Sequence, residues 1–125
     1  MKTVQQMIDE ANTAIPRISV DDAKKLVGKS DVLFLDVREP NEVLAAGKVP
    51  GAVAIPRGLV EFRACPGSQA HDKNFDKAKT VIAYCASGGR SAMVGKTLKD
   101  MGYTKVMNLG GFKGWVDGGG PVEKA

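Results

Sequence analysis

Apolar residues concentrate in two runs of the chain, residues 32–37 and residues 80–84. Polar residues flank both runs, and a short apolar run between polar segments is typical of a strand that is buried on both faces. Weaker patterns predict further strands: residues 106–109 form another apolar run, and residues 49–56 contain a turn and a strand of three or four residues. A brief strand is also expected at residues 17–20.

Between these strands the spacing of apolar residues changes to that of helices. In residues 3–13 and again in residues 90–101, apolar side chains recur every three or four positions, which places them on one helix face. Pro40 before residues 41–46 and Gly47 after them bracket another short helix. The remaining expectations are a helix from about Asp21 that ends near Gly28, a final helix at residues 110–115, and an irregular polar segment at residues 57–79.

Strands that alternate with helices along the whole chain predict an α/β domain with a mainly parallel sheet. The 125 residues are the length of one domain, and no internal repeat or long linker divides them. We therefore expect a single domain over residues 1–125, with a core of about residues 15–120 that follows a short N-terminal helix. In an open parallel sheet, ligands bind beyond the carboxyl ends of the strands.

The composition argues against several classes of function. The 18 lysines and arginines are scattered along the chain and exceed the 14 acidic residues only modestly, so we expect no nucleic-acid partner. No secretory signal or membrane-spanning run is recognised, and we expect no membrane contact. With Cys65, Cys85 and the single histidine His71, a Cys/His zinc site is not credible, and no metal is expected. A cytoplasmic protein with reduced thiols fits this pattern.

The segment around Cys85 is where chemistry is expected. Cys85 follows the predicted strand at residues 80–84, and the loop from Ala86 to Gly89 has small side chains and two glycines that can adopt positive φ. Successive N–H groups of such a loop can point inward and, with the positive end of the next helix, bind an anion. A thiol at the centre would have a lowered pKa. The alternative is that Cys85 is a small buried hydrophobic residue, but the Gly-Gly-Arg at a strand-to-helix junction favours a reactive role.

Three motifs, in this order, resemble those of a single-domain rhodanese, a sulfurtransferase. They are DVREPNEVLAAGKVPGAVAIPRG at residues 36–58, VIAYCASGGRSA at residues 81–92 and NLGGFKGW at residues 108–115. The resemblance implies a central five-stranded, mainly parallel sheet with helices on both faces, and no metal or organic cofactor. It also implies that Cys85 is the nucleophile and that the active-site loop is completed by Ala86, Ser87, Gly88, Gly89 and Arg90.

The chemistry implied by the resemblance is a double displacement. The Cys85 thiolate attacks the outer sulfur of a small anionic donor such as thiosulfate, and the persulfide passes that sulfur to cyanide, a thiol or a protein acceptor. Loop N–H groups can stabilise both sulfur anions, and a lowered pKa activates the thiol without a general base. A non-catalytic persulfide carrier between protein partners, or a redox regulator, would have the same loop. In related phosphatases the corresponding loop resembles C-X5-R. Here only four residues separate Cys85 from Arg90, and this C-X4-R spacing argues against phosphatase or arsenate chemistry.

Several charged residues are candidates for supporting roles. Asp36 and Arg38 match the D-V-R signature of the family, and we expect a scaffold ion pair or loop-bracing hydrogen bonds. Arg90 lies at a helix start, where a cation is unfavourable beside the helix dipole, so its partner is expected to be an anion, either substrate or a carboxylate, unless it is simply solvated. Arg57 and Arg63 are candidates for the mouth of the pocket, where they would attract thiosulfate.

Four further residues carry weaker expectations. Glu39 and Glu42 are expected to be helix-start charges. Lys48 stands where rhodaneses usually have histidine, which leaves the hydrogen bonding of that turn open. Cys65 could resolve the Cys85 persulfide as a disulfide only if the fold brought the two cysteines together. No spacing in the sequence indicates this, so Cys65 is expected to be a surface cysteine.

Overall fold

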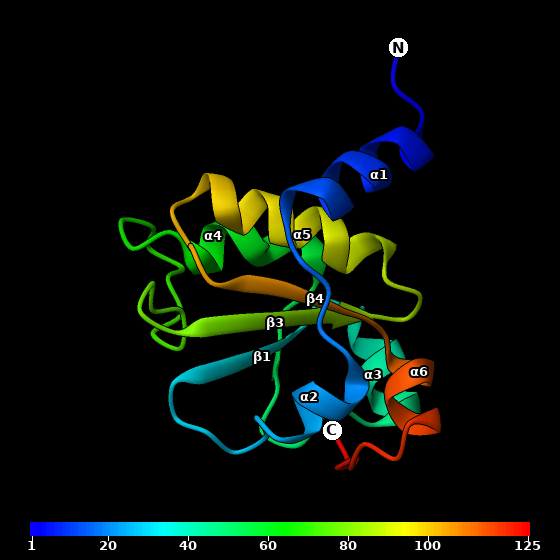
Figure 1. Ribbon diagram of the computed structural model, residues 1–125. Coiled ribbons are helices and arrows are strands. Elements are labelled where there is room, and N and C mark those ends of the chain that lie inside the picture. The colour runs from blue at the N-terminus through cyan, green and yellow to red at the C-terminus, as the bar shows by residue number, and fades with distance from the viewer.

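The computed structural model describes residues 1–125 and shows one parallel sheet between two layers of helices (Figure 1). The strand order is β2-β1-β3-β4, and all neighbours are parallel. The strands are β1 (Val32–Asp36), β2 (Val53–Ala54), β3 (Thr80–Cys85) and β4 (Val106–Gly111). The helices are α1 (Val4–Ala14), α2 (Val20–Lys24), α3 (Pro40–Ala46), the 3-10 helix η1 (Arg57–Leu59), α4 (Val60–Ala64), α5 (Gly89–Asp100) and α6 (Phe112–Asp117). The predicted α/β class is confirmed.

The sheet has four strands and not the five that the rhodanese resemblance implied. Residues 17–20, expected as a brief strand, make a single parallel bridge, between Arg17 and Asn108. The pairing stops there because Ser19 already caps α2, accepting a hydrogen bond from Asp22 N at 3.1 Å. A helix that begins directly after its cap leaves no extended residue to continue the ladder.

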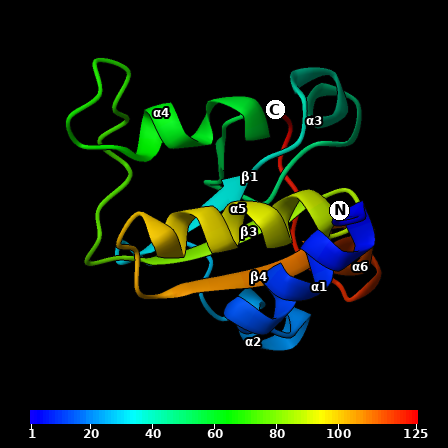
Figure 2. The same cartoon turned by 90° about the horizontal axis from the view of Figure 1, so that it is seen from above.

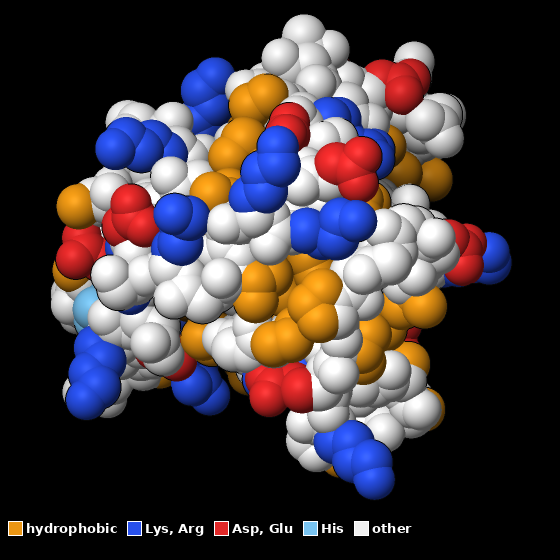
Figure 3. Space-filling view, turned by 60° about the horizontal axis from the view of Figure 1, so that its bottom comes forward, with side chains coloured by type: hydrophobic (Ala, Val, Ile, Leu, Met, Phe, Trp, Pro, Cys, Tyr) orange, Lys and Arg blue, Asp and Glu red, His pale blue; other side chains and the backbone are white.

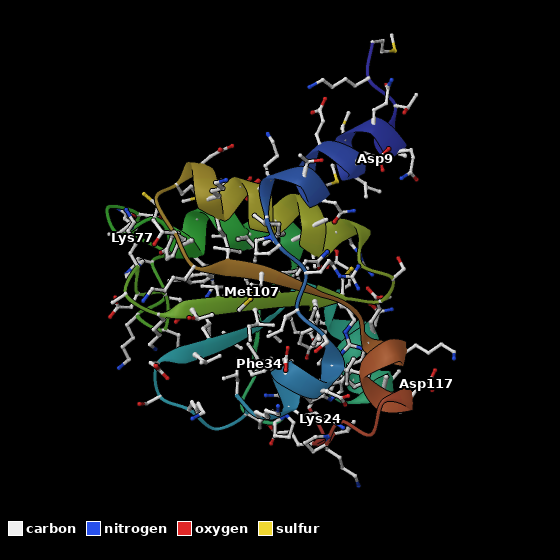
Figure 4. The ribbon with its side chains drawn as sticks, viewed as in Figure 1. Asp9, Lys24, Phe34, Lys77, Met107 and Asp117 are labelled. Atoms are coloured by element: carbon white, nitrogen blue, oxygen red, sulfur yellow. The ribbon has the colours of Figure 1, made fainter.

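The strands β1 and β3 are buried on both faces, as their apolar runs predicted. Leu35 of β1 packs in one core with Val94 of α5. Phe34 points to the opposite face, where its ring centroid lies 6.0 Å from that of Trp115 in α6. Met107 of β4 packs against this second core, on the side of the sheet covered by α2 and α6 (Figure 4). The other face is covered by α1, α4 and α5 (Figures 1 and 2).

The register of the strands brings their carboxyl ends to one edge. Asp36, the last residue of β1, lies opposite Tyr84, and Cys85 ends β3 one position later. Gly111, the last residue of β4, lies opposite Cys85. Residues that are far apart in the sequence therefore meet at this edge.

Residues 57–79 begin with helix, so the expectation of an irregular segment was wrong over its first part. Val60 and Ala64, four positions apart, are both fully buried, and the helix places them on one side. In a polar stretch, two apolar residues in a five-residue helix do not form a periodic pattern from which the helix could be predicted. Residues 65–79 contain turns but no helix or strand, as expected.

The predicted N-terminal helix is present as α1, which packs against the start of α5. It begins with a capping box, in which Thr3 Oγ1 accepts a hydrogen bond from Gln6 N and the Gln6 side chain accepts one from Thr3 N. The Ile8 side chain lies so close to Gly89 that a Cβ atom there would be only 3.2 Å away. α1 thus covers the first turn of α5.

The surface carries mixed charge. Figure 3 shows basic and acidic side chains interspersed over one face of the molecule, around a patch of hydrophobic side chains near its centre. On that face there is no large area of a single sign, which agrees with the scattered positions of lysine and arginine in the sequence. None of the helices combines the length and the apolar character that crossing a membrane requires.

Candidate active site

A sharp turn joins β3 to α5 at the carboxyl edge of the sheet (Figure 1). Cys85 ends the strand and Gly89 begins the helix, so residues 86–88 make the whole connection. Gly88 has φ +102°, a left-handed conformation that glycine adopts without steric cost. The turn places the Cys85 thiol at the positive end of α5.

The Cys85 side chain is fully buried, and hydrogen-bond donors surround its sulfur. Gly88 N donates to Sγ at 3.0 Å, and Ser91 Oγ lies 3.5 Å from Sγ. Burial acts to raise the pKa of the thiol, but hydrogen bonds from the Ser91 hydroxyl and from the backbone N–H groups of Ser91, Gly88 and Ser87 outweigh it. The pKa of Cys85 therefore lies below its ordinary value. The inward-pointing N–H groups expected from the sequence are present.

A second pair of glycines, at the end of β4, allows the loop to approach that strand closely. A Cβ atom on Gly111 would collide with the carbonyl oxygen of Ala86, and one on Gly88 would lie 3.2 Å from Gly110 Cα. Any side chain at Gly111 would push the loop away from the sheet. No role of their own was predicted for these glycines, although a second Gly-Gly directly after a strand was the available signal.

Two buried polar side chains, Ser91 of α5 and Asn108 of β4, support the loop from inside. Ser91 Oγ lies 2.7 Å from Asn108 Oδ1 and 3.2 Å from Gly88 O. Asn108 Oδ1 also accepts a hydrogen bond from Gly110 N at 2.9 Å, and Nδ2 donates to Gly88 O at 3.3 Å. Neither residue was predicted from the sequence. A lone amide in an apolar strand was the signal for Asn108, because a buried amide requires hydrogen-bond partners.

Arg90 forms a bidentate ion pair with Glu42 of α3, with N–O distances of 2.7 and 2.9 Å. Of the partners expected for Arg90, the structure shows the carboxylate, and Glu42 is more than a helix-start charge. The hydrogen bonds from Arg90 and from Glu39 N lower the pKa of Glu42 to about 2. Cys85 also adds to the raised pKa of Arg90, so Arg90 interacts with both Glu42 and the sulfur, and backbone N–H groups add to the positive potential at Cys85.

Asp36 and Arg38 form a buried ion pair at the end of β1, with a shortest distance of 2.7 Å. Arg38 Nη2 also donates to Gly47 O at 2.7 Å, at the end of α3. The guanidinium lies over the Phe112 ring of α6, 4.4 Å from its centroid. This is the arrangement of a scaffold ion pair, which ties β1 to the helices on either side of the site.

Lys48 supplies the hydrogen bonding of the turn in which rhodaneses usually have histidine. Its Nζ donates to Ala52 O at 2.7 Å and lies 3.3 Å from the Glu123 carboxylate. The backbones of Lys48 and Glu123 also form an antiparallel bridge. The lysine therefore braces this turn and attaches the C-terminal segment to it.

The two arginines expected at the pocket mouth lie at different edges of the sheet. Arg57 is at the carboxyl edge, where its N–H donates to Val37 O at 3.2 Å, and it borders a groove of about 350 Å³ between α1 and α5. Arg63 is at the far end of α4. The next residue, Ala64, accepts a hydrogen bond from Tyr103 OH at its carbonyl oxygen, at 2.6 Å. Tyr103 precedes β4, so Arg63 lies at the amino edge and does not line a pocket at Cys85.

Cys65 follows α4 and shares this distant position. It is exposed, and both cysteines are free. His71 belongs to the same irregular segment. This segment lies next to Arg63, because Asp72 N donates a hydrogen bond to the carbonyl oxygen of Arg63. The fold brings neither Cys65 nor His71 to Cys85, and no three His, Cys, Asp or Glu side chains are grouped to hold a metal ion.

Comparison with known proteins identifies the family. The profile of the rhodanese-like domain matches residues 19–117. The chain belongs to the rhodanese-like domain family. A sulfurtransferase from Allochromatium vinosum is 34% identical over 101 residues, which cover 80% of this chain and 86% of that protein. The thiosulfate:glutathione sulfurtransferase of Saccharomyces cerevisiae is 34% identical over 119 residues, which cover 85% and 81% of the two chains. Sulfur transfer is thus the activity of rhodanese relatives.

A solved structure extends the likeness to the whole chain. A protein of unknown function from Rhodopseudomonas palustris CGA009, described as a possible tyrosine phosphatase, is 40% identical with a TM-score of 0.92. The match covers 98% of this chain and 96% of that one. It therefore includes α1, which lies outside the residues that the rhodanese profile matches.

Proposed function

We propose that the protein is a sulfurtransferase that holds sulfane sulfur as a persulfide on Cys85 and transfers it by double displacement. The observation that carries the proposal is the hydrogen bond from Gly88 N to Sγ at 3.0 Å, within a loop whose only cation already has a partner. A buried sulfur that accepts hydrogen bonds from backbone N–H groups is stabilised as an anion, and a lowered pKa activates it as a nucleophile.

The first half-reaction loads the cysteine. The Sγ thiolate attacks the outer sulfur of thiosulfate, a new S–S bond forms, and the S–S bond of the donor breaks so that its electron pair leaves with sulfite. Charge is conserved, because one thiolate and one dianion become one persulfide anion and one dianion. Ala86 and Ser87 are the exposed residues of the loop, so the donor reaches the buried sulfur from their side.

The second half-reaction returns the enzyme to its starting form. Cyanide or a thiolate attacks the outer sulfur of the persulfide, the bond to Sγ breaks, and its electron pair remains on Sγ. The products are thiocyanate or a new persulfide, together with the Cys85 thiolate. The name of the Saccharomyces cerevisiae relative, thiosulfate:glutathione sulfurtransferase, supports thiosulfate as donor and a small thiol as acceptor.

Intact-mass measurement tests this proposal. After incubation with thiosulfate and removal of the excess, the protein is expected to gain the mass of one sulfur atom and to lose it to cyanide as thiocyanate. Cys85→Ser is expected to abolish the gain, whereas Cys65→Ser, the matched control, is expected to retain it. Uptake that survived in Cys85→Ser would contradict the proposal. If only a persulfide-bearing protein and no small donor loaded Cys85, the protein would be a sulfur carrier between protein partners.

The Rhodopseudomonas palustris structure raises tyrosine phosphatase chemistry as a second candidate. Two features of this chain oppose it. The loop has the C-X4-R spacing, and the Arg90 guanidinium, which a phosphoryl group would need as a bidentate partner, is occupied by Glu42. Hydrolysis of p-nitrophenyl phosphate that depended on Cys85 and matched the rate of sulfur transfer would favour the phosphatase.

A further inference from the structure

The Ser91 hydroxyl has one proton and several acceptors within reach. Asn108 Oδ1 is at 2.7 Å, Gly88 O at 3.2 Å and Cys85 Sγ at 3.5 Å. A hydroxyl donates one hydrogen bond, while its lone pairs accept others. The shortest distance assigns the proton to Asn108 as long as Sγ carries no charge, and it leaves a lone pair of Ser91 Oγ free to accept the thiol proton.

The orientation of the Asn108 amide is fixed by its neighbours. Gly110 N–H points at Oδ1 at 2.9 Å, and Nδ2 donates to Gly88 O at 3.3 Å. A flipped amide would place its NH₂ group against the Gly110 N–H, so that two donors would face each other. Asn108 therefore presents its Oδ1 acceptor to Ser91. If the Ser91 hydroxyl turns away, Oδ1 still accepts the hydrogen bond from Gly110 N.

We propose that the Ser91 hydroxyl turns from Asn108 to Sγ whenever Cys85 becomes a thiolate, and that it thereby stabilises Cys85 as the leaving group when the persulfide is discharged. Ser91 contacts the reacting sulfur, and Asn108 is a positioning residue that holds the Ser91 proton between reactions. The inference rests on the persulfide chemistry of the proposed function and assigns a donor to one of its steps.

The location of the negative charge separates the two sulfur states. In the persulfide, Sγ is a neutral bridging atom and the charge lies on the outer sulfur, so the Ser91 proton returns to Asn108. When an acceptor attacks the outer sulfur, the electron pair of the breaking S–S bond comes to Sγ, and Ser91 donates to it. A more stable leaving thiolate departs faster, whereas a more stable attacking thiolate is intrinsically less nucleophilic. Ser91 is therefore expected to speed discharge more than loading.

The charged groups near Sγ are the same in every variant whose Cys85 midpoint is compared. Arg90 of α5 faces the sulfur, and its pKa is raised chiefly by its hydrogen bond to Glu42 of α3, with Cys85 adding to the effect. The pKa of Glu42 is about 2. On β1, Asp36 and Arg38 are paired with each other. The side chains that β4 contributes at the loop are uncharged, but the Arg17 guanidinium lies beside Gly110, where a Cβ atom would be 2.7 Å from Arg17 Nη2.

The first test measures the ionisation of Cys85 and is independent of sulfur transfer. In a Cys65→Ser background, the ultraviolet absorbance of the thiolate is followed against pH. Ser91→Ala is expected to raise the midpoint by about one pH unit, because a hydrogen bond to a charged group is lost, and Ser91→Thr, which keeps the hydroxyl, is expected to restore it. An unchanged midpoint in Ser91→Ala overturns the inference, even if no donor ever loads Cys85.

The second test separates the half-reactions in single turnovers, at a pH where the thiol is fully ionised in every variant. Ser91→Ala is expected to discharge its persulfide to cyanide about 3-fold to 10-fold more slowly than the parent, while loading from thiosulfate is not slowed. If Ser91 only supported the shape of the loop, both half-reactions would slow together. Equal slowing therefore overturns the inference.

Asn108→Ala separates the two roles of this residue, and it does so even if Ser91→Ala fails to fold. With Oδ1 removed, the Ser91 proton loses its preferred acceptor and remains available to Sγ, so the midpoint of Cys85 is expected to stay or to fall. If Asn108 merely braced the loop, its removal would raise the midpoint as Ser91→Ala does. A raised midpoint in Asn108→Ala overturns the inference.

Discussion

Cys85 and Cys65 lie at opposite edges of the same sheet, and only Cys85 is surrounded by hydrogen-bond donors. Cys85 is fully buried and accepts a hydrogen bond from Gly88 N at 3.0 Å. Cys65 is exposed beyond α4 and has no hydrogen bond to its sulfur. Burial alone would disfavour a thiolate, so what distinguishes Cys85 is the set of donors at its sulfur, the Ser91 hydroxyl and the backbone N–H groups, and not the exposure of the thiol.

Gly111→Ala is expected to have the largest effect at the Cys85 edge. The new methyl group would overlap the carbonyl oxygen of Ala86, and displacing the loop is expected to reduce the rate of sulfur loading roughly 100-fold, as misplacement of a reacting group by about 1 Å can do. Single-turnover loading from thiosulfate measures it. The matched change at the other edge is Gly67→Ala, whose Cβ would meet nothing within 4 Å. Near-parent loading by Gly111→Ala would show that the close approach of β4 to the loop is dispensable.

Asp36→Ala is expected to act on stability. It would leave Arg38 buried and unpaired, which costs about 3–5 kcal/mol in the free energy of unfolding. Urea denaturation measures this cost. Asp100→Ala at the amino edge removes an exposed carboxylate that lies 3.8 Å from Lys96, and it is expected to cost no more than about 1 kcal/mol. Similar costs for the two changes would contradict the role of the Asp36–Arg38 pair as scaffold.

Glu42→Gln is expected to have a smaller, pH-dependent effect. In the folded protein the pKa of Glu42 is about 2, below its ordinary value of 4.5. A carboxylate with a lowered pKa contributes stability above its unfolded pKa and loses that contribution as the pH falls through the folded pKa. Glu42→Gln should thus be less stable than the parent at neutral pH, with a difference that narrows between pH 4.5 and about 2. Urea denaturation along that range measures it, and a constant difference would contradict the assignment.

The smallest expected effect is on the ionisation of Cys85 itself. Its lowered pKa means that the thiolate persists to lower pH in the folded protein than in the unfolded chain, so this group stabilises the fold above the unfolded pKa and loses the contribution as the pH falls. In the Cys65→Ser protein, thiolate absorbance should have a lower midpoint in buffer than in concentrated urea. If the two midpoints coincided, the fold would not stabilise the Cys85 thiolate, and Cys85 would not differ from Cys65 in this respect.

Local patterns in the sequence were enough to predict most of the fold. The apolar runs of β1 and β3 and the periodic helices α1 and α5 each depend on residues close together in the chain. The missing fifth strand and the unpredicted α4 have a different cause. Whether residues 17–20 continue a ladder depends on competition with the cap of α2, and whether Val60 and Ala64 favour a helix depends on the sheet that they cover.

The same distinction applies to the site. The position of Cys85 and the donors of its loop follow from a strand end and two adjacent glycines. The partners of the loop do not, because Glu42 is 48 residues from Arg90 and Asn108 is 17 residues from Ser91. These pairs depend on the register of parallel strands, which the sequence does not display. Arg63 was placed at the wrong edge because the helix that carries it away from Cys85 was not predicted.

The hydrogen bond between Asn108 and Gly88 has a consequence for the order of folding. Asn108 comes 20 residues after Gly88 in the chain, and synthesis proceeds from the N-terminus. A nascent chain that has emerged as far as α5 already contains Cys85 and its whole loop, but it lacks the strand against which the loop rests. The thiol therefore acquires its final surroundings only after β4 has packed against the loop.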